Sequence, residues 1–182
     1  MSAIVKLADN SSVYEVAKVS PLSIATQLSK KFDNHIFLKR EDDQIIHSFK
    51  LRGAYQKMSS MSDAQKTKGV IASSAGNHAQ GVALGASKLN IKAIIVMPTS
   101  TPQIKVRAVQ ELGAEVILYG DVYDDAFVHA KKLESEKDLC FISPYDDFEV
   151  IAGQATVAKE ILTQLDQIDY VFSPVGGGGL IS

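Results

Sequence analysis

Residues 69–97 read GVIASSAGNHAQGVALGASKLNIKAIIVM, and this stretch decides the fold class. It begins with the apolar run 69–73 and ends with the apolar run 93–97, and both runs have the composition of buried strands. The residues between them, 77–89, have the pattern of a helix. A strand, a helix and a second strand in this order predict a unit whose two strands are parallel.

The same alternation continues toward the C-terminus. Further strands are predicted at 115–119, 139–143 and 170–175, and further helices at 102–112, 121–137 and 151–165. This alternation predicts an α/β fold in which helices cover both faces of a parallel sheet. Gly113 is expected in a left-handed cap after one helix, and Asp121 is expected to be the N-cap of the next.

The residues before this unit suggest a second lobe. A helix is predicted from Ser20-Pro21 to about Phe32, a short strand at 36–39 and another helix at 48–58. We therefore expect residues 1–59 and 144–182 to form parts of a larger lobe, and residues 60–143 to form a smaller inserted α/β lobe. A strand at 170–175 would need a covering helix that does not follow, so we expect a fragment that is incomplete at its C-terminus.

Composition excludes several classes of function. The 182 residues carry 19 Lys and Arg against 21 Asp and Glu, a formal charge of -2, so no basic surplus is available for nucleic acid or an acidic membrane surface. No apolar run approaches the roughly 20 residues that cross a bilayer, and residues 1–12 do not resemble a targeting signal. The single cysteine, Cys140, excludes an internal disulfide and a cysteine-based metal cluster. No metal site is predicted, and a cytoplasmic location is expected.

Lys50 is the first candidate for chemistry, in the run His47-Ser48-Phe49-Lys50-Leu51-Arg52. Ser48 is a good N-cap, which places Lys50 in the first helical turn, where the helix dipole disfavours an ammonium. Together with burial beside Phe49, this position favours a neutral, nucleophilic amine. The alternative is an ordinary solvated lysine on an amphipathic helix.

Two loops at the carboxyl ends of predicted strands are candidate anion sites. Ser73-Ser74-Ala75-Gly76-Asn77-His78 precedes a helix, so its amide groups suit a carboxylate, although a structural turn with Asn77 as the cap fits equally well. His78 is interpreted as a helix residue only. Gly176-Gly177-Gly178-Gly179-Leu180 lets consecutive N–H groups converge on a phosphate, and a flexible linker is the alternative. The glycine run lacks the residues of a nucleoside-triphosphate loop and of a dinucleotide fingerprint, so a phosphate monoester fits better.

Taken together, these motifs resemble those of threonine dehydratases, pyridoxal-phosphate enzymes of the tryptophan-synthase-β-like fold (fold type II). The resemblance rests on Lys39-Arg40-Glu41-Asp42, on residues 48–55, on residues 73–81 and on Gly176 to Leu180, and it extends over about residues 13–182. It implies a lyase that converts L-threonine to 2-oxobutanoate and ammonia with pyridoxal 5'-phosphate, in an intact enzyme that is a homotetramer.

The resemblance also implies roles for single residues. Lys50 would bind the cofactor aldehyde covalently and act as the base at the substrate α-carbon, with Phe49 beside the cofactor ring. Asn77 would contact the phenolic oxygen of the ring. The substrate carboxylate would bind to Ser74, Ala75 and Gly76, and the phosphate to Gly176, Gly177, Gly178, Gly179 and Leu180.

Differences within this family narrow the expected activity. Ala75 occupies the position at which serine racemases carry a second base, so little racemisation of L-serine is expected. Lys39-Arg40-Glu41-Asp42 and Leu51 resemble the biosynthetic branch, which serves isoleucine synthesis, more than the catabolic serine/threonine dehydratases. A non-catalytic truncated fragment is the other alternative, because the second half of the catalytic region is missing and useful turnover by these residues alone is not expected. A nucleotide-binding module is disfavoured because both glycine fingerprints fail.

Overall fold

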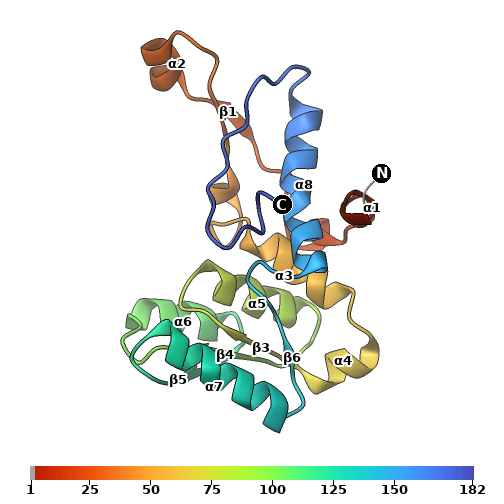
Figure 1. The fold of residues 1–182 in the computed structure, drawn as a ribbon, viewed down its shortest axis with the longest axis vertical. Coiled ribbons are helices and arrows are strands. Elements are labelled where there is room, and N and C mark those ends of the chain that lie inside the picture. Colours follow the sequence, from red (N-terminus) through yellow and green to blue (C-terminus); the bar gives the residue numbers. More distant parts are fainter. Residues whose placement is uncertain (1–2) are drawn as a thin grey trace.

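The structure, a computed structural model, describes residues 3–182 and contains a four-stranded parallel sheet (Figure 1). Its strands are β3 (Val70–Ser73), β4 (Ala93–Met97), β5 (Glu115–Leu118) and β6 (Cys140–Phe141), in the order β5-β4-β3-β6. All three pairings are parallel. The prediction of a parallel α/β sheet is therefore confirmed, and the four strands lie within or at the predicted ranges.

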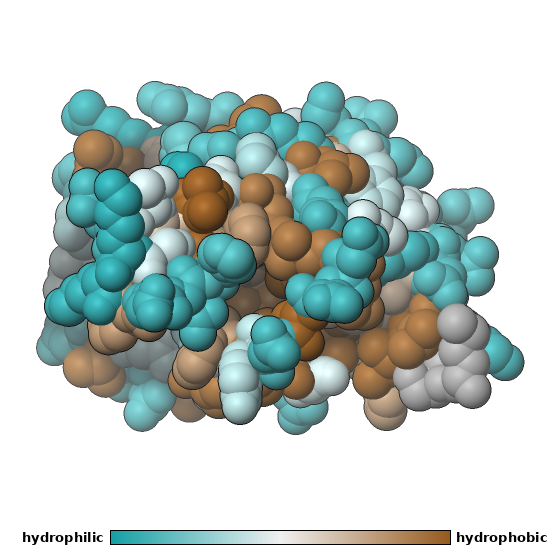
Figure 2. Space-filling view, turned by 90° about the horizontal axis from the view of Figure 1, so that it is seen from above, coloured by the Kyte–Doolittle hydropathy of each residue, from teal (hydrophilic) through white to brown (hydrophobic). Residues whose placement is uncertain are grey.

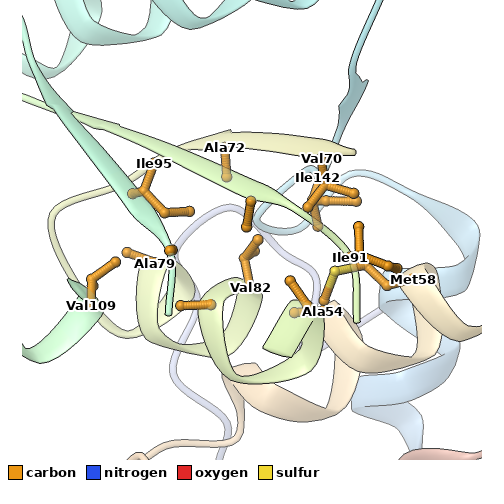
Figure 3. Packing of buried hydrophobic residues seen from close by; sticks show 14 of the residues in the cluster. Ala54, Met58, Val70, Ala72, Ala79, Val82, Ile91, Ile95, Val109 and Ile142 are labelled. Carbon is orange, nitrogen blue, oxygen red and sulfur yellow. The ribbon is translucent and has the colours of Figure 1, made fainter. Parts of the chain in front are cut away.

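Helices cover both faces of this sheet. They are α5 (Asn77–Lys88), α6 (Gln103–Glu111) and α7 (Tyr123–Glu136). Ala72 and Ile95 point toward Ala79 and Val82 of α5, as Figure 3 shows. Ile71, the residue before Ala72 in β3, packs instead against Ala126 and its neighbours on α7. Because successive strand side chains point to opposite faces, a strand of Val, Ile and Ala can fill both layers.

The rest of the chain is built around two helices that pack in succession on α5. These are α3 (Lys50–Ser59), which lies against α5, and α8 (Phe148–Gln164), which lies against α3 (Figure 1). The remaining elements are α1 (Ala3–Asp9), the 3-10 turns η1 (Val13–Glu15) and η2 (Glu41–Asp43), α2 (Thr26–Phe32), α4 (Asp63–Lys68) and the antiparallel pair β1 (Leu22–Ile24) and β2 (Phe37–Lys39).

Glycines allow these helices to approach closely. A Cβ atom on Gly81 of α5 would lie 2.9 Å from the carbonyl oxygen of Lys50, and a Cβ atom on Gly153 of α8 would lie 2.6 Å from that of Arg52. The backbone of α3 is thus in direct contact with a glycine on each side. This double contact fixes the start of α3, where Lys50 lies.

A buried charge cluster joins α3 and α8 to the N-terminal segment. The fully buried Arg52 forms ion pairs with Glu160 at 2.6 Å and with Glu41 at 2.8 Å, and Lys39 also lies 2.6 Å from Glu160. Burial favours the neutral acid, but hydrogen bonds from Arg52 and Lys39 outweigh it and lower the pKa of Glu160. Each buried charge therefore has a partner, as a buried ion requires.

Several local predictions were wrong. Residues 170–175 form no strand, and Phe172 is 94% exposed there, because no strand within residues 3–182 lies beside them to pair. The helix expected from Ser20-Pro21 begins only at Thr26, since residues 22–24 pair with β2. Asp121 is not an N-cap: its N–H and that of Val122 donate to the carboxylate of Asp125 within the helix. Gly113 does adopt the expected left-handed conformation, with φ of 95°.

The division into two lobes stays a prediction. In Figure 1 the parallel sheet with its covering helices lies below α3, and β1, β2, α2 and most of α8 lie above. The upper end, viewed in Figure 2, carries hydrophobic side chains among hydrophilic ones. Within residues 3–182, no helix has both the length and the apolar character that a membrane span requires.

Candidate active site

Lys50 is the first residue of α3, as the sequence predicts for the first helical turn. The residue before the helix is Phe49 and not Ser48, so the N-cap was placed one residue too early; the Ser48 hydroxyl still accepts a hydrogen bond from the Lys50 N–H at 3.3 Å. The Lys50 side chain is half-buried, with its Nζ 5.4 Å from the centre of the Phe49 ring. Burial lowers the pKa of the Lys50 ammonium. The predicted activation of this amine thus has a structural basis.

The Lys50 amine contacts the backbone of a distant segment. Nζ donates a hydrogen bond to the carbonyl oxygen of Pro144 at 2.6 Å, just beyond β6. Within residues 3–182 it makes no hydrogen bond with Asn77 or with the glycine run. A carbonyl acceptor holds the amine in place without the permanent charge pairing that a carboxylate would impose.

The predicted carboxylate loop connects the end of β3 to the start of α5. The N–H of Gly76 donates to the Ser74 hydroxyl at 3.2 Å, and a Cβ atom on Gly76 would meet nothing within 4 Å. Asn77 is the first residue of α5 and is exposed. The loop therefore presents helix N-terminal amides and one amide side chain toward open space, which suits an anionic ligand.

The glycine run 176–179 lies against Tyr145. A Cβ atom on Gly177 would lie 2.2 Å from Cδ1 of the Tyr145 ring, and one on Gly179 would lie 2.9 Å from the Tyr145 Cα atom. Gly178 has φ of 93°, which disfavours any residue with a side chain. In the part of the chain described, 3–182, none of the four glycine N–H groups donates a hydrogen bond, so they are free to bind an anion.

Residues 144 and 145 bring the lysine and the glycine run together. Pro144 accepts the hydrogen bond from Lys50, and Tyr145 packs on Gly177 and Gly179. On the other side, Gly81 of α5 contacts the backbone of Lys50, which brings the helix that follows the carboxylate loop against the lysine. All three predicted motifs thus surround the segment at the carboxyl end of β6.

The sequence did not predict Pro144 or Tyr145 for this site, and it gave Ser73 and His78 no role beyond their place at the two ends of the carboxylate loop. The Ser73 side chain is 1% exposed and its hydroxyl has no hydrogen-bond partner among the described residues. His78 is 4% exposed and its Nε2 lies 2.9 Å from the carbonyl oxygen of Ile142. No local pattern marks Pro144 or Tyr145, because their contacts join residues far apart in the sequence. His78 is a helix residue, as interpreted, but its ring also reaches the β6 segment.

The residues present fit pyridoxal phosphate. The cofactor needs an amine for its aldehyde, a cluster of donors for its phosphate and space for the amino-acid carboxylate. Lys50 offers an amine with a lowered pKa, the glycine run offers free N–H groups, and Gly76 borders open space. The Lys50 amine contacts Pro144 and the glycine run contacts the next residue, Tyr145. This proximity suits one compact molecule that carries both an aldehyde and a phosphate.

Comparison with known proteins identifies the family of this chain. Residues 14–182 match the family model described as "Pyridoxal-phosphate dependent enzyme". The chain is 56% identical over 180 residues to L-threonine dehydratase biosynthetic IlvA of Haemophilus influenzae, a match that covers 99% of this chain and 35% of that protein.

Solved structures agree on the fold. The processed form of threonine deaminase isoform 2 from Solanum lycopersicum superposes with a TM-score of 0.96 at 52% identity, covering 98% of this chain and 49% of that one. Maize serine racemase superposes with a TM-score of 0.92 at 32% identity, covering 98% of this chain and 54% of that one. The chain spans about a third of the length of the curated relatives it matches and about half of these solved chains.

Because the family model and the relatives match over nearly the whole chain, this chain belongs to the pyridoxal-phosphate-dependent enzymes of fold type II, and its fold is that of the tomato threonine deaminase.

Proposed function

We propose that this chain carries the catalytic lysine and much of the cofactor site of an enzyme that converts L-threonine to 2-oxobutanoate and ammonia. The observation that carries the proposal is the convergence of Lys50 and the glycine run on Pro144 and Tyr145. The names of the similar proteins, L-threonine dehydratase and threonine deaminase, support this substrate over other amino acids. Overall, L-threonine loses water, and water then replaces nitrogen in the enamine product to release ammonia.

Each motif has a role in this reaction. Bound pyridoxal phosphate supplies the electron sink that stabilises negative charge at the substrate α-carbon. Lys50 would hold the cofactor aldehyde and remove the α-proton, and burial, which lowers the pKa of its ammonium, favours the neutral amine for that step. Phe49 would lie beside the cofactor ring, and Asn77 would bind the ring's phenolic oxygen.

The two loops bind the anionic groups. Ser74, Ala75 and Gly76 bind the substrate carboxylate through helix N-terminal amides. The phosphate binds to the N–H groups that follow Val175, from Gly176, Gly177, Gly178, Gly179 and Leu180. Because both anions are held by backbone groups, the reacting carbon is positioned without cationic side chains that would pair with the carboxylate.

Ala75 argues for elimination over racemisation. Racemisation needs a proton donor on the face of the substrate opposite the lysine, and a methyl group cannot exchange a proton. The fold alone does not separate these activities, because a serine racemase superposes nearly as well as a threonine deaminase. The proposal therefore includes slow formation of D-serine, and Ala75→Ser is the variant expected to increase it.

The wider setting is part of the same proposal. A biosynthetic threonine dehydratase supplies 2-oxobutanoate for isoleucine, and we place the enzyme in the cytoplasm as a homotetramer when intact. The alternatives are a catabolic serine/threonine dehydratase and a non-catalytic piece. The identity to proteins named biosynthetic, 54–56% for the first relatives, favours the biosynthetic enzyme.

Cofactor binding is tested on the chain itself. The purified 182 residues are incubated with pyridoxal phosphate, reduced with borohydride, and digested to locate the adduct. We expect a visible Schiff-base band and a reduced adduct on Lys50, both absent in Lys50→Ala and retained in Lys88→Ala, which removes an exposed lysine. An adduct spread over exposed lysines, unaffected by Lys50→Ala, would contradict the assignment.

Turnover is tested in a chimera that restores the missing length. The corresponding N-terminal part of the Haemophilus influenzae relative is replaced by residues 1–182, and 2-oxobutanoate is measured with L-threonine as substrate. We expect activity that Lys50→Ala abolishes. A chimera that binds the cofactor and acts on L-serine but not on L-threonine would support the catabolic alternative, and one that binds it and acts on neither would support the non-catalytic alternative.

A further inference from the structure

His78 makes a hydrogen bond whose acceptor lies at the end of the sheet. Its Nε2 lies 2.9 Å from the carbonyl oxygen of Ile142, the first residue after β6. A carbonyl oxygen only accepts, so Nε2 carries the proton and donates it. The Ile142 N–H donates a hydrogen bond to the carbonyl oxygen of Ile71 in β3 at 2.9 Å. His78 therefore binds the last residue of this segment that is still hydrogen-bonded to the sheet.

The residues that follow Ile142 are the ones that reach the lysine. The chain bends over residues 144–147, and the Ser143 hydroxyl accepts a hydrogen bond from the N–H of Asp146 at 3.1 Å. Pro144 then accepts the hydrogen bond of the Lys50 amine, and Tyr145 supports Gly177. The position of the segment 142–145 therefore sets where the lysine amine and the glycine run lie relative to each other.

We propose that His78 is a positioning residue for the cofactor site: its Nε2–H holds the segment 142–145 at the end of β6, and through Pro144 and Tyr145 it fixes the Lys50 amine and the glycine run. This inference rests on the proposed function in so far as Lys50 is the reactive lysine. It assigns His78 no contact with substrate or cofactor.

The chemistry of the site requires an uncharged donor at this position. An imidazolium would place a buried positive charge near the Lys50 ammonium, whereas the neutral ring donates one hydrogen bond without a charge. Burial is the main cause that lowers the pKa of His78 to about 4; the hydrogen bond with Ile142 opposes the shift, and the charge of Lys50 adds to it. The ring is thus a neutral donor across the physiological range.

A positioning role for His78 can be distinguished from a packing role because another side chain can supply the same hydrogen-bond donor. The amide nitrogen of glutamine reaches about as far as Nε2 of histidine and can donate to Ile142, whereas leucine fills similar space without a donor. A positioning role therefore requires His78→Gln to behave like the native chain and His78→Leu to differ. A packing role requires the reverse, since leucine is the more apolar replacement.

The test measures the accessibility of Lys50 without the cofactor. The native chain and both variants are treated briefly with acetic anhydride at pH 8, and acetylation of Lys50 relative to exposed Lys88 is measured by peptide mass spectrometry. We expect His78→Leu to raise the relative rate at Lys50 by about 3- to 10-fold, the factor by which losing one hydrogen bond shifts a local opening equilibrium. His78→Gln is expected to restore the native rate.

Two outcomes overturn the inference: equal Lys50 rates in all three folded chains, or equal changes in the Leu and Gln variants. If His78→Leu fails to fold, nitrogen NMR of the native chain decides instead. A proton on Nε2 of neutral His78 supports the inference, and a proton on Nδ1 alone overturns it. Failure of pyridoxal phosphate to label Lys50 would count against the proposed function. The acetylation and NMR measurements use no cofactor and would still test the role of His78.

Discussion

At the scale of single residues, the buried His78 makes folding stability depend on pH. Its pKa is lowered from 6.5 to about 4 in the folded chain, so between these values the unfolded chain binds a proton that the folded chain excludes. Stability contributed by the neutral ring is complete above pH 6.5 and is lost as the pH falls toward 4. From His78 alone, we expect the free energy of unfolding to decrease by about 1.4 kcal/mol for each unit that the pH falls within this window.

Urea titrations at half-unit steps from pH 7.5 to 4.5 measure this slope. His78→Gln is the control, because it keeps an uncharged donor but does not titrate. The difference between the two chains isolates His78 from the other histidines and the carboxylates. If the free energy of unfolding depends on pH equally in the native chain and in the variant, His78 takes up no proton on unfolding in this range, and the prediction is wrong.

Arg52 carries a second residue-scale prediction, on stability. Its guanidinium is fully buried and contacts Glu41 and Glu160, so Arg52→Met would leave two carboxylates facing each other with Lys39 as the remaining cation on Glu160. Removing one partner of a buried ion pair costs about 3–5 kcal/mol, which is a large share of the stability of a domain this size. Urea unfolding at pH 7 measures the loss.

Arg40→Met is the matched control for Arg52→Met. Arg40 also pairs with a carboxylate, that of Asp42 at 2.7 Å, but both side chains are well exposed. Its removal should leave the free energy of unfolding nearly unchanged, because solvent screens an exposed pair. Comparable losses in the two variants would mean that burial of Arg52 does not set the strength of its interactions.

At the scale of elements, the contact between α3 and α8 depends on a glycine. A Cβ atom on Gly153 would lie 2.6 Å from both the Arg52 carbonyl oxygen and the Gly53 Cα atom, and neither backbone atom can move without displacing its helix. We expect Gly153→Ala to destabilise the chain by about 1–3 kcal/mol, the usual cost of overpacking, despite the better helix propensity of alanine. Thermal unfolding followed by circular dichroism measures the change.

Gly176→Ala is the control for that substitution. Its Cβ atom would meet nothing within 4 Å, so the same chemical change should leave the melting temperature close to that of the native chain. A drop in melting temperature with Gly176→Ala as large as that with Gly153→Ala would show that loss of glycine itself, and not overlap with α3, is responsible.

Elements with a local pattern could be predicted from the sequence, and elements that depend on a distant partner could not. The strands 70–73 and 93–97 are short apolar runs bounded by turns, so their assignment needed only neighbouring residues. Residues 22–24 were assigned to a helix because their pairing with 37–39 is a tertiary contact. The helix α4 was missed although Ser62 and Gln65 form a capping box, a pattern that the sequence does display.

The candidate site shows the same limit. Lys50 and the carboxylate loop lie at the start of a helix, and the glycine run follows a stretch whose sequence predicts a strand. Chemistry is expected at such positions, and the resemblance joined the three motifs. Pro144 and Tyr145 join them physically, yet the relevant contacts are a backbone carbonyl and a ring face, which no residue pattern encodes. His78 was read as a helix residue because nothing local shows that its ring reaches Ile142.

At the scale of the whole molecule, residues 170–175 combine a strand-like sequence with an unpaired backbone. Phe172 is 94% and Tyr170 82% exposed, and within residues 3–182 no N–H group of this segment donates a hydrogen bond. An exposed apolar segment with free backbone groups is a template for pairing between copies. We therefore expect the chain to self-associate through this segment as its concentration rises.

Charge placed in the segment should suppress that association. Val175→Asp is compared with Val128→Asp on α7, because both valines are 67% exposed and both variants add one negative charge. The backbone groups at Val128 are already hydrogen-bonded within α7. Only the charge at position 175 should therefore oppose pairing between the segments of two copies. In sedimentation velocity over a concentration series, Val175→Asp is expected to raise the concentration at which larger species form, while Val128→Asp behaves like the native chain. Equal shifts in both variants would assign the effect to net charge, and the segment 170–175 would then have no special part in association.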